Sequence, residues 1–186
     1  IHPGSAKGKM KNALLVGMEF ESMLPAGEKP QFTEGYEGYF HLNNMSGSVE
    51  SALLDYLIRD HSMEIFEKRK AYAMKVGDFL NEKYGAGTVE VEINDMYYNM
   101  AEKIRPHMYL MDIAAAAFKE LGVDAPVVRP VRGGTDGSRL SYMGVPCPNL
   151  CAGGLNAHGK YEYVPVESME RIVELLVRLA LAPIKD

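Results

Sequence analysis

The stretch from Tyr36 to Arg59 reads YEGYFHLNNMSGSVESALLDYLIR. An aromatic-rich run, Tyr36–Met45, is followed by a Ser-Gly-Ser turn and by a second run, Val49–Arg59, whose even-numbered positions from Ala52 to Ile58 are apolar. Alternation with period two is typical of a strand with one buried face. The stretch therefore predicts a β-hairpin, with Arg59 at the end of its second strand and on the face opposite the core.

The segments around this hairpin suggest a layered α+β unit. A helix is expected over Gly4–Leu24 with Ser5 as its cap, a second helix over Met63–Lys83, and a strand over Val89–Ile93, where valine and isoleucine alternate with glutamate. The order is helix, strand, strand, helix, strand. One more strand before it would complete the β-α-β-β-α-β order of a ferredoxin-like unit.

The second half of the chain has a different pattern. A helix is expected from Pro106 to Leu121, short strands at Val127–Val128 and Asn149–Ala152, a short helix near Leu140, and a final helix over Val166–Leu181. Strands that alternate with helices indicate part of a parallel α/β sheet. Two short strands are too few for a closed core. We therefore expect two incomplete domains, residues 1–100 and 101–186.

Composition excludes several classes of protein. The chain has 186 residues, 47% hydrophobic and 24% charged, and a net charge of −5. These values argue against disorder, and the absence of a long basic run argues against nucleic-acid binding. No apolar run is long enough to span a membrane. The chain begins without methionine, which indicates either a piece of a longer chain or a processing site.

The two cysteines, Cys147 and Cys151, are too few for a disulfide scaffold and favour a reducing cytoplasm. Their close spacing leaves a local zinc or redox pair open. The alternative is a pair of buried free thiols flanking a strand.

Three places could carry chemistry. Arg59, on the open face of its strand, could bind a carboxylate through two hydrogen bonds; the alternative is an ion pair with Asp55 or Asp60. His158 lies in a glycine-rich loop after a short strand, where open α/β sheets often carry a site; the alternative is a surface turn.

The third place is the turn RGGTDG, Arg132–Gly137, between a strand and a helix. Its backbone N–H groups would suit an anion or a developing oxyanion at the helix start. The alternative is that Thr135 or Asp136 simply caps the helix.

At these residues the chain resembles the peptidase T family, tripeptide aminopeptidases with two co-catalytic zinc ions. The segments that carry the resemblance run in order along the whole chain: Ile1–Gly8, Thr33–Gly38, Ile58–Asp60, Tyr97–Met100, Arg132–Gly137, Met143–Asn149 and His158–Glu162. It implies a lid or dimerisation domain of the β-α-β-β-α-β type, its first strand missing here, over residues 1–100. Residues 101–186 would be the C-terminal part of the zinc-peptidase α/β catalytic domain.

The resemblance also implies roles for residues. His158 matches a zinc ligand, and His2 matches a catalytic lid histidine that reaches the partner subunit's site and holds the scissile carbonyl oxygen. Arg59 matches an arginine that binds the peptide's carboxylate. Asn99 and Arg132 would also bind substrate, as would the other three residues of the same turn: Gly134, Thr135 and Asp136.

A complete site in this family holds two zinc ions through five ligands, of which this chain has one. We therefore expect a cytoplasmic, homodimeric enzyme that hydrolyses the N-terminal peptide bond of tripeptides, and we expect the 186-residue chain alone to be inactive. Two rivals remain: a non-catalytic dimerisation or binding module, and another clan member such as an aminoacylase or a desuccinylase.

Overall fold

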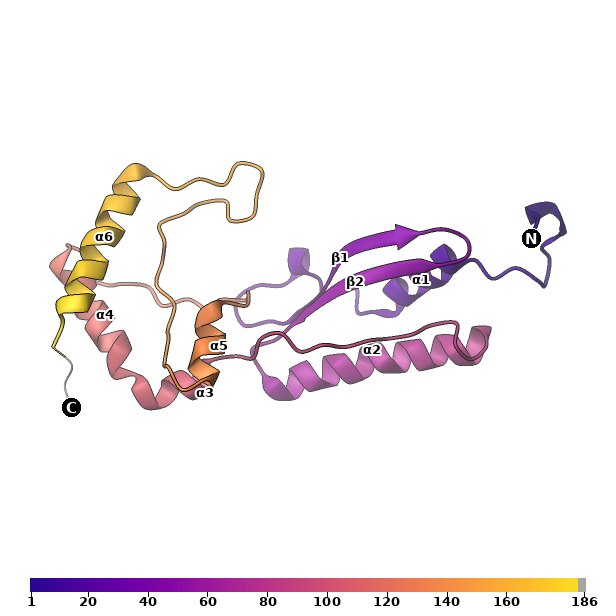
Figure 1. Ribbon diagram of the computed structural model, residues 1–186, viewed down its shortest axis with the longest axis horizontal. Helices are drawn as coiled ribbons and strands as arrows, with labels where there is room; N and C mark the ends of the chain where they lie inside the picture. Colours follow the sequence, from indigo (N-terminus) through magenta and orange to yellow (C-terminus); the bar gives the residue numbers. More distant parts are fainter. Residues whose placement is uncertain (184–186) are drawn as a thin grey trace. The chain divides into compact units, whose positions relative to one another are not determined.

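The computed structural model describes residues 1–183, which divide into two compact units (Figure 1). One unit contains residues 1–99 and 130–133; the other contains residues 100–129 and those from 134 onward. The helices and strands of the described residues are, in order, η1 (Pro3–Ser5), α1 (Ala13–Met23), η2 (Pro30–Phe32), β1 (Tyr39–Gly47), β2 (Ala52–Arg59), α2 (Met63–Tyr84), α3 (Ala101–Ile104), η3 (Arg105–His107), α4 (Tyr109–Glu120), α5 (Asp136–Tyr142) and α6 (Val166–Leu181). The protein therefore mixes helices with a small antiparallel sheet.

The predicted hairpin is confirmed as the antiparallel pair β1–β2. Tyr39 lies opposite Arg59, and the register shifts by one residue at Asn43, which forms a bulge. Tyr56 and Ile58 pack against the core, whereas Asp55 is exposed. The period-two pattern therefore predicted the faces of β2 correctly.

The first long helix begins later than predicted. Residues 3–5 form only η1, and α1 begins at Ala13, where the Asn12 side chain accepts a hydrogen bond from the Leu14 N–H (3.0 Å). Gly8 has φ +68°, a backbone conformation outside the right-handed helix. The cap is therefore Asn12 and not Ser5. The second predicted helix is confirmed as α2.

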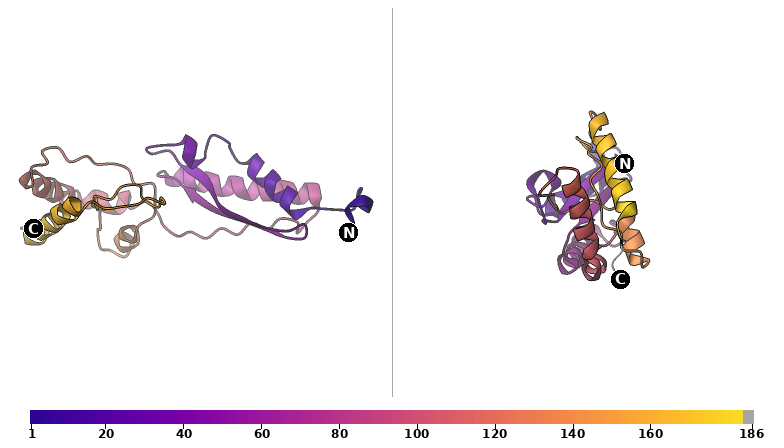
Figure 2. Two further views of the ribbon diagram at one scale, coloured as in Figure 1. Left: turned by 90° about the horizontal axis from the view of Figure 1, so that it is seen from above. Right: turned by 90° about the vertical axis from the view of Figure 1, so that its left-hand side faces the viewer.

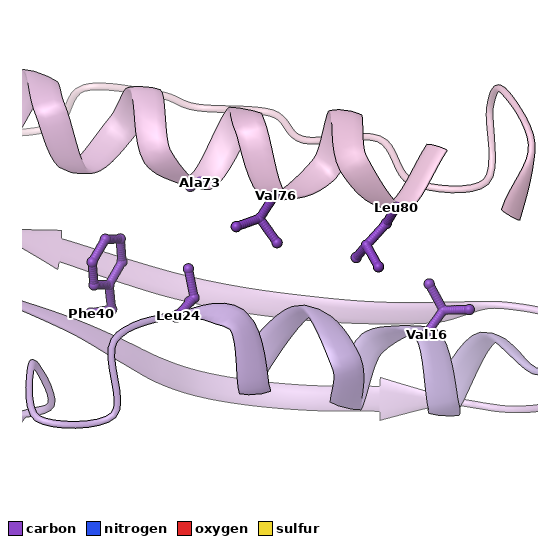
Figure 3. Close-up of a cluster of buried hydrophobic side chains, with 6 residues drawn as sticks. All are labelled: Val16, Leu24, Phe40, Ala73, Val76 and Leu80. Carbon is purple, nitrogen blue, oxygen red and sulfur yellow. The ribbon is translucent and has the colours of Figure 1, made fainter. Parts of the chain in front are cut away.

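A single apolar cluster joins the helices to the hairpin in the N-terminal unit (Figure 3). Its buried members are Val16, Leu24, Phe40, Ala73, Val76 and Leu80. Leu80 is fully buried and Phe40 nearly so. They come from α1, the turn after it, β1 and α2, so one cluster holds these four segments together.

Residues 89–93 do not form the expected strand. They are extended, and burial alternates from Val89 to Ile93 as in a strand, but they pair with no other strand of the described chain. The segment runs back along α2 (Figure 1). Asn81 of α2 bonds both the N–H and the C=O of Val89 (2.8 Å each). A Cβ at Gly77 would lie 2.6 Å from Val91, so only glycine allows this close approach.

A carboxylate links the two long helices. Glu19 of α1 accepts hydrogen bonds from Lys83 and from Tyr84 of α2 (2.6 Å each). These bonds, that of Lys83 first, lower the pKa of Glu19 below its ordinary value, and the bond to Glu19 raises the pKa of Lys83.

We therefore predict that Glu19→Gln lowers the stability of the chain near neutral pH. Because the folded pKa of Glu19 is depressed, its contribution is present above the unfolded value of about 4.3 and is lost as pH falls through the folded pKa. The wild-type and variant curves of unfolding free energy against pH, from urea titrations, should converge at low pH. Curves that stay parallel would contradict this link.

The second unit contains helices but not the two expected strands. Val127 and Val128 are about three-quarters exposed, and residues 149–152 form no strand and pair with none among residues 1–183. A lone strand without a neighbour has no hydrogen-bond ladder to hold it. The final helix α6 matches its prediction and lies against α4 (Figure 2). Arg178 of α6 donates a hydrogen bond to the Glu120 carboxylate of α4 (2.6 Å). No helix within residues 1–183 is long and apolar enough to cross a bilayer.

Candidate functional site

The candidate site lies at the end of β2, around Arg59. This residue is half-buried, and its guanidinium lies over the ring of Tyr97, 5.9 Å from the centroid. Across the hairpin it is opposite Tyr39. The twisted hairpin and the returning segment after α2 therefore bring a cation and two aromatic rings together at one end of the unit.

The alternative interpretation of Arg59, an ion pair with Asp55 or Asp60, is wrong. Asp60 is almost completely buried and binds Arg69 of α2 instead, with Arg69 Nε 2.9 Å from its carboxylate. The Asp60 carboxylate also accepts the Ser62 N–H (2.8 Å). Asp55 accepts a hydrogen bond from Asn43 (3.0 Å). Among residues 1–183, Arg59 has no carboxylate within ion-pairing distance.

Arg59 and Asn99 line the same small cavity, of about 30 Å³. This is room for about two water-sized groups, the size of a carboxylate. Asn99 donates a hydrogen bond from Nδ2 to the carbonyl of His61 (2.9 Å), which ties the returning segment to the turn after β2. The structure thus brings together two of the predicted substrate-binding residues, 40 positions apart in the sequence.

Arg132 joins the same end of the hairpin from a distant part of the chain. Its guanidinium lies over the ring of Tyr39 (4.6 Å to the centroid) and donates to the carbonyl and the hydroxyl of Thr33. Its Nε is buried and has no hydrogen-bond partner in the described chain. Sequence reasoning missed Thr33 and Tyr97 as contacts, although both lie in segments that carry the family resemblance.

Gly134, Thr135 and Asp136 belong to the other unit. Thr135 is at the N-cap position of α5, but its side chain does not cap the helix, and its Oγ1 is buried without a partner within residues 1–183. Gly134 and Asp136 are exposed. The expectation of a simple side-chain cap is therefore wrong, and the Thr135 hydroxyl is left available.

The turn packs against the segment that follows α5. Ser141 Oγ donates to the Gly137 carbonyl (2.7 Å) and accepts the Cys147 N–H (3.0 Å). A Cβ at Gly137 would lie 2.7 Å from the Cys147 carbonyl oxygen, so glycine is required there. The expectation of buried thiols flanking a strand is wrong, because Cys147 is half-buried, Cys151 is exposed and neither lies beside a strand.

His2 is exposed and is next to the N-terminus, which lies beyond the turn between β1 and β2 (Figure 1), whereas Arg59 is the last residue of β2, at the opposite end of the hairpin. Its Nδ1 accepts a hydrogen bond from the Gly4 N–H (3.1 Å). In a neutral imidazole, an accepting Nδ1 leaves the proton on Nε2. His2 therefore presents an N–H donor to its surroundings.

His158 is exposed in a loop closed by the Leu155–Tyr163 bridge. The backbone N–H of His158 donates a hydrogen bond to the Glu162 carboxylate (3.1 Å). It has φ +62°, and Asn156 has φ +57°. Two non-glycine residues in the left-handed region within three positions are uncommon, and such strain is frequent at functional sites.

The described residues do not form a zinc site by themselves. No group of three or more histidine, cysteine, aspartate or glutamate side chains within residues 1–183 could hold a metal ion. Zinc in proteins needs three or four such ligands. The chain therefore offers single donors, such as His158, and not a ligand set.

Comparisons with known proteins agree with the resemblance. The chain is 51% identical over 179 residues to "Peptidase T" of Caldanaerobacter subterraneus subsp. tengcongensis and 55% identical over 177 residues to "Peptidase T" of Macrococcus caseolyticus. These matches cover 96% and 95% of this chain but only 44% and 43% of the relatives. The chain therefore spans less than half the length of these proteins.

A solved structure has a similar fold. The crystal structure of a tripeptidase from Staphylococcus aureus subsp. aureus Mu50 matches with a TM-score of 0.63 at 19% identity, over 96% of this chain and 47% of that one. The model of the peptidase family M20/M25/M40 matches residues 11–182. The chain therefore belongs to the M20/M25/M40 family of peptidases.

Proposed function

We propose that this chain is part of a peptidase that removes the N-terminal residue from tripeptides, with Arg59 binding the C-terminal carboxylate of the substrate. The observation that carries the proposal is the state of Arg59: half-buried, beside a carboxylate-sized cavity and without an acidic partner in the described chain. A desolvated arginine gains most from a planar carboxylate that it can bind with two hydrogen bonds.

A carboxylate-binding site at a fixed position would also select substrates by peptide length. If the scissile bond must lie at one distance from Arg59, only a peptide of matching length can meet both requirements. Arg132, with one guanidinium nitrogen unpartnered in the described residues, adds positive charge at the same end of the hairpin. Asn99 holds the wall of the cavity. Gly134, Thr135 and Asp136 belong to the other unit and are proposed as substrate-binding residues on the family resemblance alone.

His2 is proposed as a catalytic donor. Its Nε2–H would stabilise the oxyanion that develops on the scissile carbonyl. Because His2 lies far from Arg59 in its own unit, we propose that it serves the site of the partner subunit in a homodimer. Such an arrangement makes the site of one subunit incomplete without the other.

His158 is proposed as one of five zinc ligands, with two zinc ions per complete active site and the other ligands outside these 186 residues. Zinc in such sites lowers the pKa of bound water. The strained loop around His158 supports the proposal, because its backbone conformation is held by Glu162 and by the Leu155–Tyr163 bridge.

We predict that His158→Ala lowers zinc affinity by at least about 10- to 100-fold in an enzyme of the relatives' full length. The loss of a residue that only supports a ligand already costs about this much, and the loss of the ligand itself should cost no less. Metal content after dialysis, measured by atomic spectroscopy, gives a readout that does not depend on turnover. The matched control is His107→Ala, at a histidine outside the proposed site. Equal zinc content in both variants would exclude His158 as a ligand.

The remaining parts of the proposal concern architecture and location. Residues 1–100 are proposed as a ferredoxin-like lid and dimerisation domain, and residues 101–186 as the C-terminal part of the catalytic domain of a cytoplasmic enzyme. The names of the relatives favour a tripeptidase over an aminoacylase or a desuccinylase.

The test compares two proteins with the same substrates. An enzyme of the relatives' full length that contains this region should release the N-terminal residue from tripeptides and leave N-acylated amino acids intact, as followed by chromatography. The 186-residue chain with added zinc should do neither. Chelator-sensitive turnover by the chain alone would contradict its predicted inactivity, and hydrolysis of only acylated amino acids would identify the rival enzyme class.

A further inference from the structure

The cavity beside Arg59 also has an acidic wall. Asp60, the next residue in the chain, lines the same cavity of about 30 Å³, and its side chain is only 3% exposed. A carboxylate at this position would act against a substrate that binds Arg59 in two ways. It would repel the substrate carboxylate, and it would compete with it for the guanidinium of Arg59.

Both oxygens of the Asp60 carboxylate are already engaged. Oδ2 accepts a hydrogen bond from Nε of Arg69 in α2 (2.9 Å), and Oδ1 accepts one from the Ser62 N–H (2.8 Å). A Cβ at Gly38, the residue before β1, would overlap the same carboxylate, so only glycine allows the chain to cover it. The carboxylate is therefore shielded from water, and its positive partner is Arg69 and not Arg59.

Arg69 is itself held on three sides. Besides Asp60, its guanidinium binds the Glu28 carboxylate and lies over the Phe40 ring, 5.4 Å from the centroid. Phe40 belongs to the buried apolar cluster (Figure 3), and its N–H donates a hydrogen bond to the Glu28 carbonyl (2.8 Å). The Arg69 side chain is 11% exposed. A planar guanidinium with these three contacts has one well-defined position beside Asp60.

The two arginines near Asp60 differ in what they can reach. Arg59 lines the cavity and has no carboxylate within ion-pairing distance among residues 1–183. Arg69 is not among the residues that line the cavity and contacts Asp60 from α2. One cation therefore neutralises the acidic wall from outside the cavity, and the other stays available inside it.

We propose that Arg69 is a positioning residue for the substrate carboxylate. By holding and neutralising Asp60, it removes a competitor for Arg59 and reduces the repulsion that the substrate carboxylate would meet in the cavity. The inference rests on the proposed function, because it requires that Arg59 binds the C-terminal carboxylate of the substrate.

An ion pair that only joined α2 to the end of the hairpin would make the same contact, but the two roles differ in one consequence. If Arg69 acts through the charge of Asp60, removing that charge makes Arg69 dispensable for substrate binding. If Arg69 only supports the fold, removing Asp60 as well cannot repair its loss.

The test is steady-state kinetics in an enzyme of the relatives' full length, with a tripeptide and with its amide. The quantity compared is the carboxylate preference, the ratio of kcat/KM for the tripeptide to kcat/KM for the amide. Arg69→Met should lower this preference about tenfold or more, because the unpaired Asp60 would then bind Arg59. Adding Asp60→Asn to Arg69→Met should restore the preference to within about threefold of the wild type. A double variant that stays as low as Arg69→Met would overturn the proposal.

Two further variants keep the test decisive if Arg69→Met does not fold. Arg69→Lys keeps the positive charge and should keep most of the preference. Asp60→Asn alone removes the acidic wall while Arg69 stays in place, so the preference should equal or exceed that of the wild type. A fall of about tenfold or more with Asp60→Asn would show that the ion pair is needed as a structural support and would overturn the proposal.

The matched control is Lys83→Met. It breaks another ion pair that joins α2 to a different segment, the one with Glu19 of α1, and should leave the preference unchanged. A fall in this variant as large as in Arg69→Met would mean that any broken ion pair of α2 has the effect, and it would also overturn the proposal.

Arg59→Ala separates the failure of this inference from the failure of the proposed function. If Arg59→Ala lowers the preference and Arg69→Met does not, Arg59 binds the carboxylate without help from Arg69, and only this inference is wrong. If Arg59→Ala leaves the preference unchanged, Arg59 does not bind the substrate carboxylate, and both are wrong.

Discussion

Replacing Arg59 by alanine in an enzyme of the relatives' full length is expected to lower kcat/KM for a tripeptide with a free carboxylate by about 10- to 150-fold. This range corresponds to the roughly 1.5–3 kcal/mol of a hydrogen bond to a charged group. The half-buried guanidinium has no acidic partner within residues 1–183, so the substrate carboxylate would be the partner that is lost. Arg59→Lys should recover only part of the loss, because lysine cannot make the two-pronged contact.

The control for this prediction is the substrate itself. A tripeptide amide lacks the negative charge, so the wild type should cleave it poorly and Arg59→Ala should lower its cleavage little further. Lys68→Ala removes a positive charge from an exposed i,i+4 pair with Glu64 and should change neither rate. Steady-state kinetics of the four enzyme–substrate combinations give the coupling energy. Equal losses with the free and the amidated tripeptide would show that Arg59 acts structurally.

The apolar pattern of the sequence correctly predicted the elements whose formation depends on neighbouring residues in the chain. The hairpin, the faces of β2 and the bounds of α2 and α6 follow from apolar periodicity, capping by Ser62 and the stop at Gly85. The start of α1 was missed, because Asn12 offers a better-placed cap than Ser5, and Gly8 adopts a conformation that ends helical geometry before it.

The missed strands have one physical cause. Val89–Ile93, Val127–Val128 and Asn149–Ala152 have suitable residues, but a strand needs a neighbour, and periodicity says nothing about where the neighbour lies. In the first case the structure keeps the extended shape and the alternating burial through Asn81 and Gly77, without a ladder.

The candidate site could be predicted only as separate residues. Arg59 was identified from its place at a strand end. It has no ion pair with Asp60 because Arg69 of α2 binds the Asp60 carboxylate instead. The contact between Arg132 and Thr33 joins residues 99 positions apart. Such contacts follow from tertiary packing, which a single sequence does not reveal.

The largest expected loss of stability follows from Leu80→Ala. Leu80 of α2 is fully buried in the apolar cluster that α2 forms with α1 and the hairpin, so its truncation removes apolar contacts and leaves a cavity, at a cost of about 2–5 kcal/mol. The matched control is the neighbouring Phe79→Ala. Phe79 is half-exposed on another side of the helix, and its replacement should cost at most about 1 kcal/mol although more atoms are removed. Urea unfolding of the 186-residue chain, with the slope against denaturant unchanged, gives both values. An equal loss in the two variants would mean that the Phe79 side of α2 is also covered in solution, and that the cluster of Figure 3 is only part of the core.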